Sequence, residues 1–341
     1  MSGFASLVDQ KRPVRLLTAA LSSGHLPHAF LFTGIDGIGK KIAAMAFAMA
    51  CNCFNRQNGV LPEQSESVPA ERCPIEPCGE CRSCKKIISG NHPDIILVNP
   101  SGAMIKVDQI RALCGKLVLK PYEANKRFAI ITDAQKLNPE AGNTLLKTLE
   151  EPPEHTVFIL TALQASDILP TIVSRCQQIR FNPISLNSLQ TTIKNNHGLD
   201  SAKASAIASM AQGSITRAES MTKSNWIDKR NWIIDELEAL PSRSINLSLA
   251  FSEALSKNKE WLFTAFEIMK NWLRDIVVYN YAPEKIINKD LSAQIKISSK
   301  KTPVSTLVIK IKAIEKAERD IKANSNIRLT LDSLMIMLSK G

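Results

Sequence analysis

The sequence of 341 residues contains no apolar run that approaches the ~20 residues needed for a membrane-spanning helix. Its first residues, MSGFASLVDQKRPVR, lack the apolar core of a secretory signal peptide, and the chain has no internal repeat or long low-complexity tract. These absences argue against a membrane-embedded, secreted or repeat protein. We therefore expect a cytoplasmic protein with no membrane partner.

The composition is that of a globular chain, with 44% hydrophobic and 22% charged residues. The length is sufficient for two or three domains with sizeable cores. A formal net charge of +11 favours an anionic partner such as nucleic acid, although basic surfaces without such a partner are also common. The eight cysteines are unevenly clustered, which indicates a reducing compartment and a metal site rather than disulfides.

A glycine-rich turn follows the apolar run Ala29–Phe32 and precedes a helix-forming segment, Lys41–Cys53. Glycines let such a turn approach a ligand closely, and its backbone N–H groups gather at a helix N-terminus, where phosphate binds well. The spacing fits the phosphate-loop pattern except at its last position, where a Ser or Thr should hold Mg²⁺ and a lysine stands instead. The candidate nucleotide-binding residues here are Gly34, Gly37, Gly39, Lys40 and Lys41. An ordinary glycine-rich turn in an α/β protein is the alternative.

Strands and helices alternate over residues 29–181, which predicts an α/β fold with a parallel sheet covered on both faces. A helix is expected before the sheet, over residues 4–24. The further strands are expected at Asp94–Val98, Phe128–Asp133, Thr156–Leu160 and Gln178–Phe181, and the helices between them at Val107–Leu119, Asn143–Glu151 and Asp167–Val173.

From Ser185 onward the patterns predict helices only, with apolar stripes typical of core packing in a bundle. The expected helices are Leu186–His197, Ser201–Gln212, Ile215–Thr222, Trp226–Leu240, Leu247–Leu255, Glu260–Tyr279, Val304–Lys322 and Leu329–Leu338.

Asp133 ends a predicted buried strand, where a phosphate-loop NTPase keeps the acid that holds Mg²⁺. The next residue, Ala134, stands where a related ATPase has the glutamate that activates water. Together with Lys41, this alanine predicts that hydrolysis is lost, whereas nucleotide binding can survive. A strand-end helix cap is an equally good interpretation of Asp133 alone.

Two C-x₂-C steps bring Cys78, Cys81 and Cys84 close together, as in a structural zinc site. Four thiolates leave no open position for water, so the predicted Zn²⁺ is structural rather than catalytic. The fourth ligand has to be Cys73, Cys53 or Cys51.

The order of these motifs resembles the clamp-loader ATPases of the AAA+ class, and most of all the family of delta-prime subunits of bacterial DNA polymerase III. The resemblance covers nearly the whole chain, and the LLKTLEEPP and SRC segments are specific to clamp loaders. Its motifs are His28–Gly34, the cysteine module, His92-Pro93-Asp94, Thr132-Asp133-Ala134, Leu145–Pro153, Ser174-Arg175-Cys176, Gly213-Ser214 with Arg217, and Asn324–Asn326.

The resemblance implies roles for three residues. The first zinc ligand lies thirteen residues beyond the lysine of the phosphate loop, which favours Cys53 over Cys73. Arg175 would be an arginine finger that acts in trans on ATP held by a neighbouring subunit. Arg217 would be the sensor-2 arginine of the lid, near the nucleotide.

The resemblance also implies the domains and the function. An AAA+ domain would span residues 1–183 with a zinc-binding insertion at about 51–90, followed by a helical lid (184–222) and an all-α collar (223–341) for oligomerisation. The chain would join gamma/tau and delta subunits in a hetero-pentamer that loads the sliding clamp on primer-template DNA. It would have little or no ATPase activity of its own, and the resemblance leaves open whether ATP binds to the modified loop. The alternatives are an active gamma/tau-like ATPase and a zinc-containing nucleic-acid-binding module.

Overall fold

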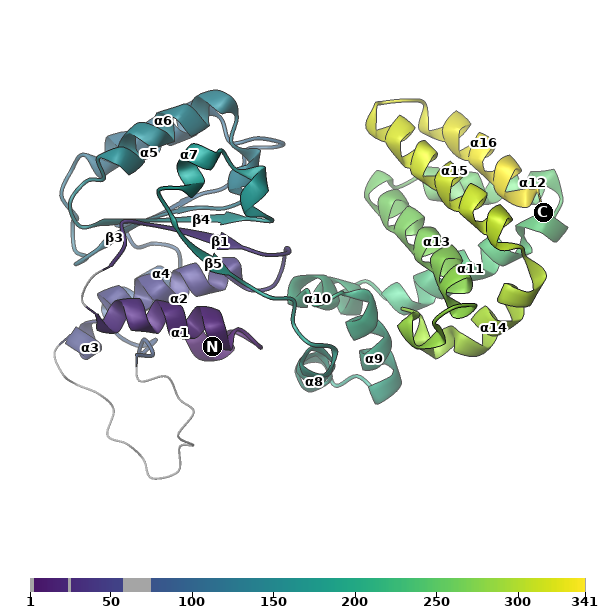
Figure 1. The fold of residues 1–341 in the computed structure, drawn as a ribbon, viewed down its shortest axis with the longest axis horizontal. Helices are drawn as coiled ribbons and strands as arrows, with labels where there is room; N and C mark the ends of the chain where they lie inside the picture. The colour runs from purple at the N-terminus through teal and green to yellow at the C-terminus, as the bar shows by residue number, and fades with distance from the viewer. Residues whose placement is uncertain (1–2, 24–25, 58–74, 341) are drawn as a thin grey trace. The chain divides into compact units, whose positions relative to one another are not determined.

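The computed structural model describes residues 3–23, 26–57 and 75–340 (Figure 1). The chain divides into two compact units. The first comprises Met1–Leu189 and Gly213–Thr216, and the second comprises Gln190–Gln212 and Arg217–Gly341. Each is described by itself below, and the domain boundaries near residues 183 and 222 stay predictions.

The first unit is built on a five-stranded sheet of order β2-β3-β4-β1-β5, in which all neighbouring strands are parallel. The sheet confirms the predicted parallel α/β fold. Its strands are β1 (Ala29–Thr33), β2 (Ile95–Val98), β3 (Arg127–Ile131), β4 (Thr156–Ala162) and β5 (Gln177–Arg180).

Strand β1 lies inside the sheet and is buried along its whole length. Phe30 and Phe32 belong to one core cluster, whereas Ala29 and Leu31 belong to another. Because successive side chains of a strand point to opposite faces, a continuous apolar run suits a strand covered on both sides.

Helices cover both faces of this sheet (Figure 1). One face carries α1 (Lys11–Ser22), α2 (Lys40–Asn52) and α4 (Arg82–Ile88), whose apolar residues share a core with Phe30 and Phe32. The other face carries α5 (Val107–Leu117), α6 (Pro139–Glu150) and α7 (Pro170–Val173). A short α3 (Phe54–Gln57) follows α2.

The predicted helix over residues 4–24 is wrong in its first part. A short 3₁₀ helix, Phe4–Ser6, precedes α1, and the chain turns at Asp9 with φ 57°. The buried Gln10 amide exchanges hydrogen bonds with the backbone of Asn182, and the Asp9 carboxylate accepts the Ser185 N–H at 2.9 Å. These long-range bonds hold residues 7–10 outside a helix.

The predicted helix Asp167–Val173 is also divided. Ala165–Asp167 form a 3₁₀ helix and α7 begins only at Pro170, the first position of a helix, where the missing N–H of proline has no cost.

The remaining chain is helical in the described residues, as predicted. Its helices are α8 (Leu186–His197), α9 (Ser201–Met210), α10 (Ile215–Lys223), α11 (Trp226–Ala239), α12 (Ile245–Ser256), α13 (Lys259–Tyr279), α14 (Ser292–Lys301), α15 (Val304–Lys322) and α16 (Ile327–Ser339).

Helix α13 is central to the second unit and packs against α11, α12, α14 and α15. Its Trp272 is 1% exposed. Helix α14 was not predicted, because it is polar and buries only Ile295. Among the helices of the described residues, none combines the length and apolar composition needed to cross a membrane.

Candidate functional site

The phosphate loop, which we define as Gly34–Lys40, connects β1 to α2 as predicted. Gly37 has φ 75°, and a Cβ at this residue would lie 2.8 Å from the Thr216 Cβ. The Gly37 carbonyl accepts hydrogen bonds from the N–H groups of Ile215, at 3.0 Å, and Thr216, at 3.3 Å. Glycine is therefore required at this position, because residues 214–216 lie directly against the loop.

Lys40 is the most buried charged residue of the loop, with 7% of its surface exposed. Its ammonium donates hydrogen bonds to the carbonyls of Gly34 and Ile35 and lies 3.6 Å from the Asp36 carboxylate. Burial lowers the pKa of Lys40, and the charges of Asp36 and Asp133 oppose that shift. The loop therefore holds a desolvated cation at its centre, the chemistry that a phosphate group requires.

Asp133 lies just beyond β3, with a left-handed φ of 52°. Its N–H donates to Thr161 Oγ1 at 3.1 Å, and its carboxylate accepts a hydrogen bond from Lys136 Nζ at 3.0 Å. Asp133 therefore occupies the predicted place at the carboxyl edge of the sheet, but as the partner of a lysine. Ala134 follows it and is buried. Lys136 was missed from the sequence, although its i+3 spacing from Asp133 could have indicated this ion pair.

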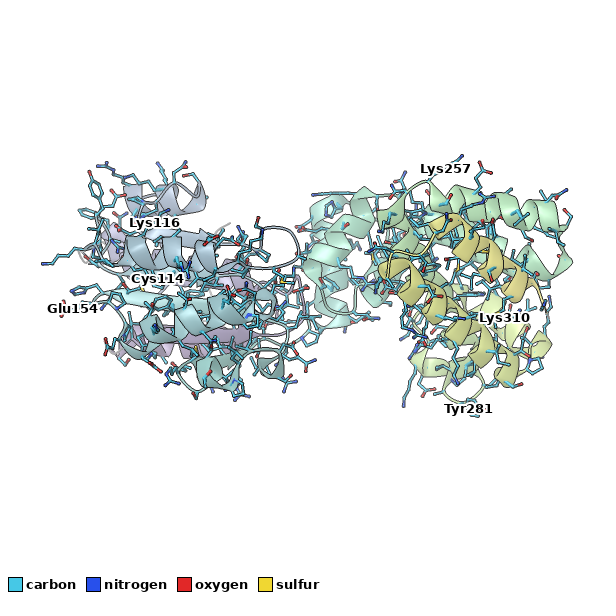
Figure 2. All side chains as sticks on the ribbon, turned by 90° about the horizontal axis from the view of Figure 1, so that it is seen from above. Cys114, Lys116, Glu154, Lys257, Tyr281 and Lys310 are labelled. Atoms are coloured by element: carbon cyan, nitrogen blue, oxygen red, sulfur yellow. The ribbon has the colours of Figure 1, made fainter. Side chains whose placement is uncertain are left out.

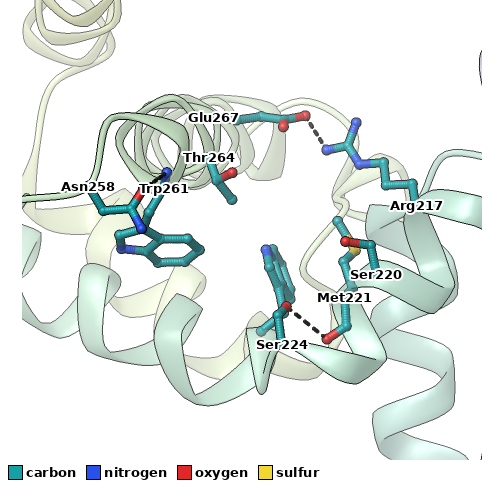
Figure 3. A pocket seen from close by; sticks show the side chains of 9 residues that line it. Arg217, Ser220, Met221, Ser224, Asn258, Trp261, Thr264 and Glu267 are labelled. Carbon is teal, nitrogen blue, oxygen red and sulfur yellow. Dashed lines mark hydrogen bonds and ion pairs between the residues drawn. The ribbon is translucent and has the colours of Figure 1, made fainter.

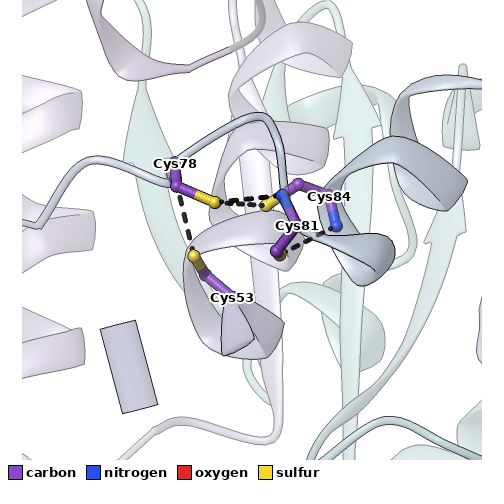
Figure 4. Close-up of side chains that lie close together, drawn as sticks. All are labelled: Cys53, Cys78, Cys81 and Cys84. Atoms are coloured by element: carbon purple, nitrogen blue, oxygen red, sulfur yellow. Dashed lines mark hydrogen bonds between the residues drawn. The ribbon is translucent and has the colours of Figure 1, made fainter. Parts of the chain in front are cut away.

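Four cysteine thiols converge where α2 ends and α4 begins (Figure 4). The sulfur atoms of Cys53, Cys78, Cys81 and Cys84 all lie within 4.8 Å of one another, and we call these residues the four-cysteine cluster. Of the candidates for a fourth ligand, Cys53 and not Cys51 belongs to this cluster. Cys73, the other alternative, lies outside the described residues.

The donor set of the four-cysteine cluster fits a tetrahedral metal. Zinc–sulfur bonds of ~2.3 Å imply sulfur–sulfur separations of about 3.8 Å, and Cys78 Sγ lies 4.0 Å from Cys84 Sγ. Although burial alone would raise the pKa of Cys81, N–H groups of Cys84 and Phe54 that donate to it lower that pKa to about 7. Burial raises the pKa of Cys84. The cluster could therefore hold a metal such as zinc, whose positive charge would favour the thiolate forms.

The His92-Pro93-Asp94 motif anchors a surface segment. Asp94 is 1% exposed and accepts hydrogen bonds from the N–H groups of residues 122–124, at 2.8 to 2.9 Å, and from the Arg127 guanidinium, at 3.3 Å. Arg127 in turn donates to the carbonyls of residues 116, 119 and 120. The backbone N–H groups and Arg127 lower the pKa of Asp94 although burial acts to raise it. The buried pair thus fixes the segment between α5 and β3.

Arg175 lies between α7 and β5 on the surface of the first unit. Its guanidinium donates to the Thr171 carbonyl at 2.9 Å and to the Glu150 carboxylate at 2.7 Å. The side chains of Arg175 and Glu150 are 35% and 51% exposed. Arg175 is therefore not a buried structural arginine. Water can replace its hydrogen bond to Glu150 at little cost in free energy.

Arg217, predicted to be near the nucleotide, belongs to α10 and to the second unit. It forms an ion pair with Glu267 of α13, at one side of a pocket of about 300 Å³ (Figure 3). No local sequence pattern indicated Glu267 as the partner, because it lies fifty residues from Arg217. The remaining residues that line this pocket are Ser220, Met221, Ser224, Trp226, Asn258, Trp261 and Thr264.

Residues 9–185 match the family described as DNA polymerase III, delta subunit. The chain belongs to this family. A second match, to the description DNA polymerase III, delta subunit, C terminal, covers residues 224–340. The place of the chain in the DNA polymerase III delta subunit family confirms the resemblance that its motifs indicated.

Two curated relatives show how far this similarity extends. DNA polymerase III subunit delta' of Bacillus subtilis (strain 168) is 29% identical over 336 residues, which are 97% of each chain. DNA polymerase III subunit tau of the same strain is 37% identical over 186 residues, which are 54% of the chain described here and 30% of tau. Among solved structures, a gamma subunit-related protein of Thermotoga maritima aligns with 97% of this chain and 99% of its own, at 16% identity and a TM-score of 0.43.

Proposed function

We propose that this chain acts as a delta-prime subunit of a bacterial DNA polymerase III clamp loader, the machine that places the sliding clamp on primed DNA. The observation that carries the proposal is the similarity to a delta-prime subunit over 97% of both chains. The similarity to tau covers only 54% of this protein, which argues against the gamma/tau-like alternative.

The chain's own residues support a subunit that does not hydrolyse ATP. Lys41 stands where a hydroxyl would hold Mg²⁺, and Ala134 stands where a glutamate would activate water. Asp133, the remaining acid, is paired with Lys136. The phosphate loop would then bind a nucleotide without hydrolysing it. Arg217 stays a candidate nucleotide-binding residue from the family resemblance alone.

Arg175 is the residue through which this subunit would serve catalysis elsewhere. A guanidinium supplied in trans stabilises the charge that develops on a transferred phosphoryl group and can be worth ~10³–10⁵ in rate. Arg175 is partly exposed and its only charged partner in the described residues is the surface residue Glu150. It could therefore leave Glu150 for the γ-phosphate of ATP held by a neighbouring gamma/tau subunit.

The surfaces of both units suit assembly with other proteins. In the first unit, Val118, Leu119 and Tyr122 are 82%, 72% and 85% exposed on the segment that Asp94 and Arg127 anchor. In the second, Leu329, Ile336 and Met337 form an exposed apolar stripe on α16. Exposed apolar patches of this kind mark binding sites. These two surfaces are candidates for the contacts that a hetero-pentamer with gamma/tau and delta and its sliding clamp would require.

The four-cysteine cluster would hold a structural Zn²⁺ in this subunit. Cys53 ends α2, which starts at the phosphate loop, while the other three cysteines surround the start of α4. Zinc would therefore fasten α4 to the helix that carries the loop, and would contribute folding free energy rather than chemistry.

Reconstitution tests the proposed function. The purified chain is mixed with delta, gamma/tau and the sliding clamp, and loading of labelled clamp onto primed circular DNA is measured with this chain present and omitted. We expect a stable complex on size-exclusion chromatography and loading that depends on the chain. Failure to join delta and gamma/tau would contradict the proposal, and DNA-stimulated ATP hydrolysis by the isolated chain would favour the gamma/tau-like alternative.

A further inference from the structure

The phosphate loop does not fit the magnesium ion that normally accompanies a nucleotide in such a loop. Mg²⁺ requires oxygen ligands in near-octahedral geometry. Lys41, in the first turn of α2, offers an ammonium group, which can donate hydrogen bonds but cannot ligate a metal. The residue that should supply a metal ligand is thus itself a cation.

The acid on the opposite side is also engaged by a lysine. Asp133 Oδ2 accepts a hydrogen bond from Lys136 Nζ at 3.0 Å, and Lys136 is three residues away on the same turn. A metal at this carboxylate would have to displace that ammonium group. A lysine is therefore present at both positions that should bind Mg²⁺: Lys41 replaces the hydroxyl residue, and Lys136 is paired with the Asp133 carboxylate.

The charge around the loop is nevertheless suited to phosphate. Lys40, Lys41 and Lys136 outnumber the nearby acids Asp36 and Asp133, and the first turn of α2 contains no acidic residue. The N-terminus of α2 adds a partial positive charge of about +0.5. The buried Lys40 ammonium already donates to two carbonyl oxygens of the loop, a geometry in which it could equally donate to phosphate oxygens.

We infer that the phosphate loop binds the polyphosphate of a nucleotide without a divalent cation, with Lys41 in the place of Mg²⁺. The inference extends the proposed function, in which this loop does not hydrolyse ATP. Free ATP carries more negative charge than its magnesium complex, so a site lined by lysines should prefer the free form. Such a ligand would stabilise the loop and would not be turned over.

The test is a binding measurement on the full chain. Anisotropy of a fluorescent ATP is recorded during titration with protein, once in buffer freed of divalent cations by a chelating resin and once with excess MgCl₂ at the same ionic strength. A resin-treated buffer is used instead of EDTA so that the four-cysteine cluster is not stripped of metal. We expect severalfold tighter binding without Mg²⁺.

Two variants and a control make this result specific. Lys40→Ala should weaken binding roughly 10–100-fold, the effect of removing a charge-assisted hydrogen bond. Lys41→Thr, which restores the hydroxyl, should reverse the order so that Mg²⁺ tightens binding. Lys257→Thr removes an exposed lysine outside the loop and should change neither value. Thermal unfolding of each variant shows whether it is folded.

Each remaining outcome overturns the inference. Tighter binding of the unchanged chain with Mg²⁺ would show that the loop still uses the metal. No binding in either buffer would show that the loop takes no nucleotide, and binding that survives Lys40→Ala would place the nucleotide elsewhere. None of these results bears on clamp loading, which reconstitution tests separately.

Discussion

The Arg175 guanidinium donates a hydrogen bond to the Glu150 carboxylate across 2.7 Å, from the segment after α7 to the last residue of α6. Both side chains are partly exposed, so the pair contributes about 1 kcal/mol or less to folding. The pair is therefore a surface interaction rather than a part of the core of the first unit.

Arg175→Ala is therefore expected to leave the melting temperature and complex assembly almost unchanged. The DNA- and clamp-stimulated ATPase of the reconstituted complex should fall, by an amount approaching ~10³-fold at the site that the arginine serves. Glu150→Gln is the matched control, because it removes the partner and leaves the arginine. Full ATPase and loading by the Arg175→Ala complex would return Arg175 to a structural role.

Cys81→Ser should remove bound metal and lower stability together, because a structural zinc site contributes to folding free energy. Metal content by mass spectrometry and the melting temperature are the measurements. Cys114→Ser is the control, since this thiol lies on α5, where Cys114 Sγ is 3.2 Å from Thr148 Oγ1 and outside the four-cysteine cluster (Figure 2). If the Cys81→Ser protein retained one zinc per chain, Cys81 would not be a ligand.

Asp94 should make the free energy of unfolding depend on acidic pH. The pKa of Asp94 is lower in the folded state than the ~3.9 of an unfolded aspartate. Its contribution to the free energy of unfolding is therefore complete above the unfolded pKa and is lost as pH falls through the lower, folded-state pKa. Asp94→Asn should destabilise the protein by about 3 kcal/mol at neutral pH, because it leaves Arg127 buried without a counter-charge.

Urea unfolding of both proteins between neutral and acidic pH measures this effect. The difference between the unchanged protein and Asp94→Asn should shrink below about pH 4. Glu154→Gln, at an exposed acid, serves as the control for general charge effects (Figure 2). A difference that stayed constant with pH would mean that Asp94 acts through packing alone.

The isolated chain should hydrolyse ATP negligibly, since the metal-binding hydroxyl and the general base are both missing. A phosphate-release assay with and without primed DNA tests this expectation. The double variant Lys41→Thr with Ala134→Glu should regain only partial activity, because Lys136 still engages the Asp133 carboxylate. Motor-like turnover by the unchanged chain would contradict the prediction.

The sequence predicted all five strands. Four of them, β1 to β4, are short apolar runs between turn signals, a pattern that does not depend on distant residues. It failed where distant residues decide the structure. Residues 7–10 have helical periodicity, but Asp9 and Gln10 bond to the chain more than 170 residues away. Helix α14 was not predicted because it has too few apolar residues to produce an apolar stripe.

The residues of the candidate site also fall into those that local sequence predicts and those that depend on distant residues. The glycines, Lys40 and three of the cysteines follow from local spacing, which the backbone of a loop largely determines. Cys53 needed either the family resemblance or the folded chain, because 25 residues separate it from Cys78. The Glu267 partner of Arg217 and the contact of residues 214–216 with Gly37 depend on packing between elements, which no single stretch of sequence encodes.

Strand β5 forms one edge of the sheet, and three of its four residues are exposed and polar: Gln177, Gln178 and Arg180. Long polar and charged side chains along an edge discourage another strand from adding to it. This edge of the sheet therefore disfavours pairing with the sheet of a second copy of the chain, which lowers the risk of aggregation.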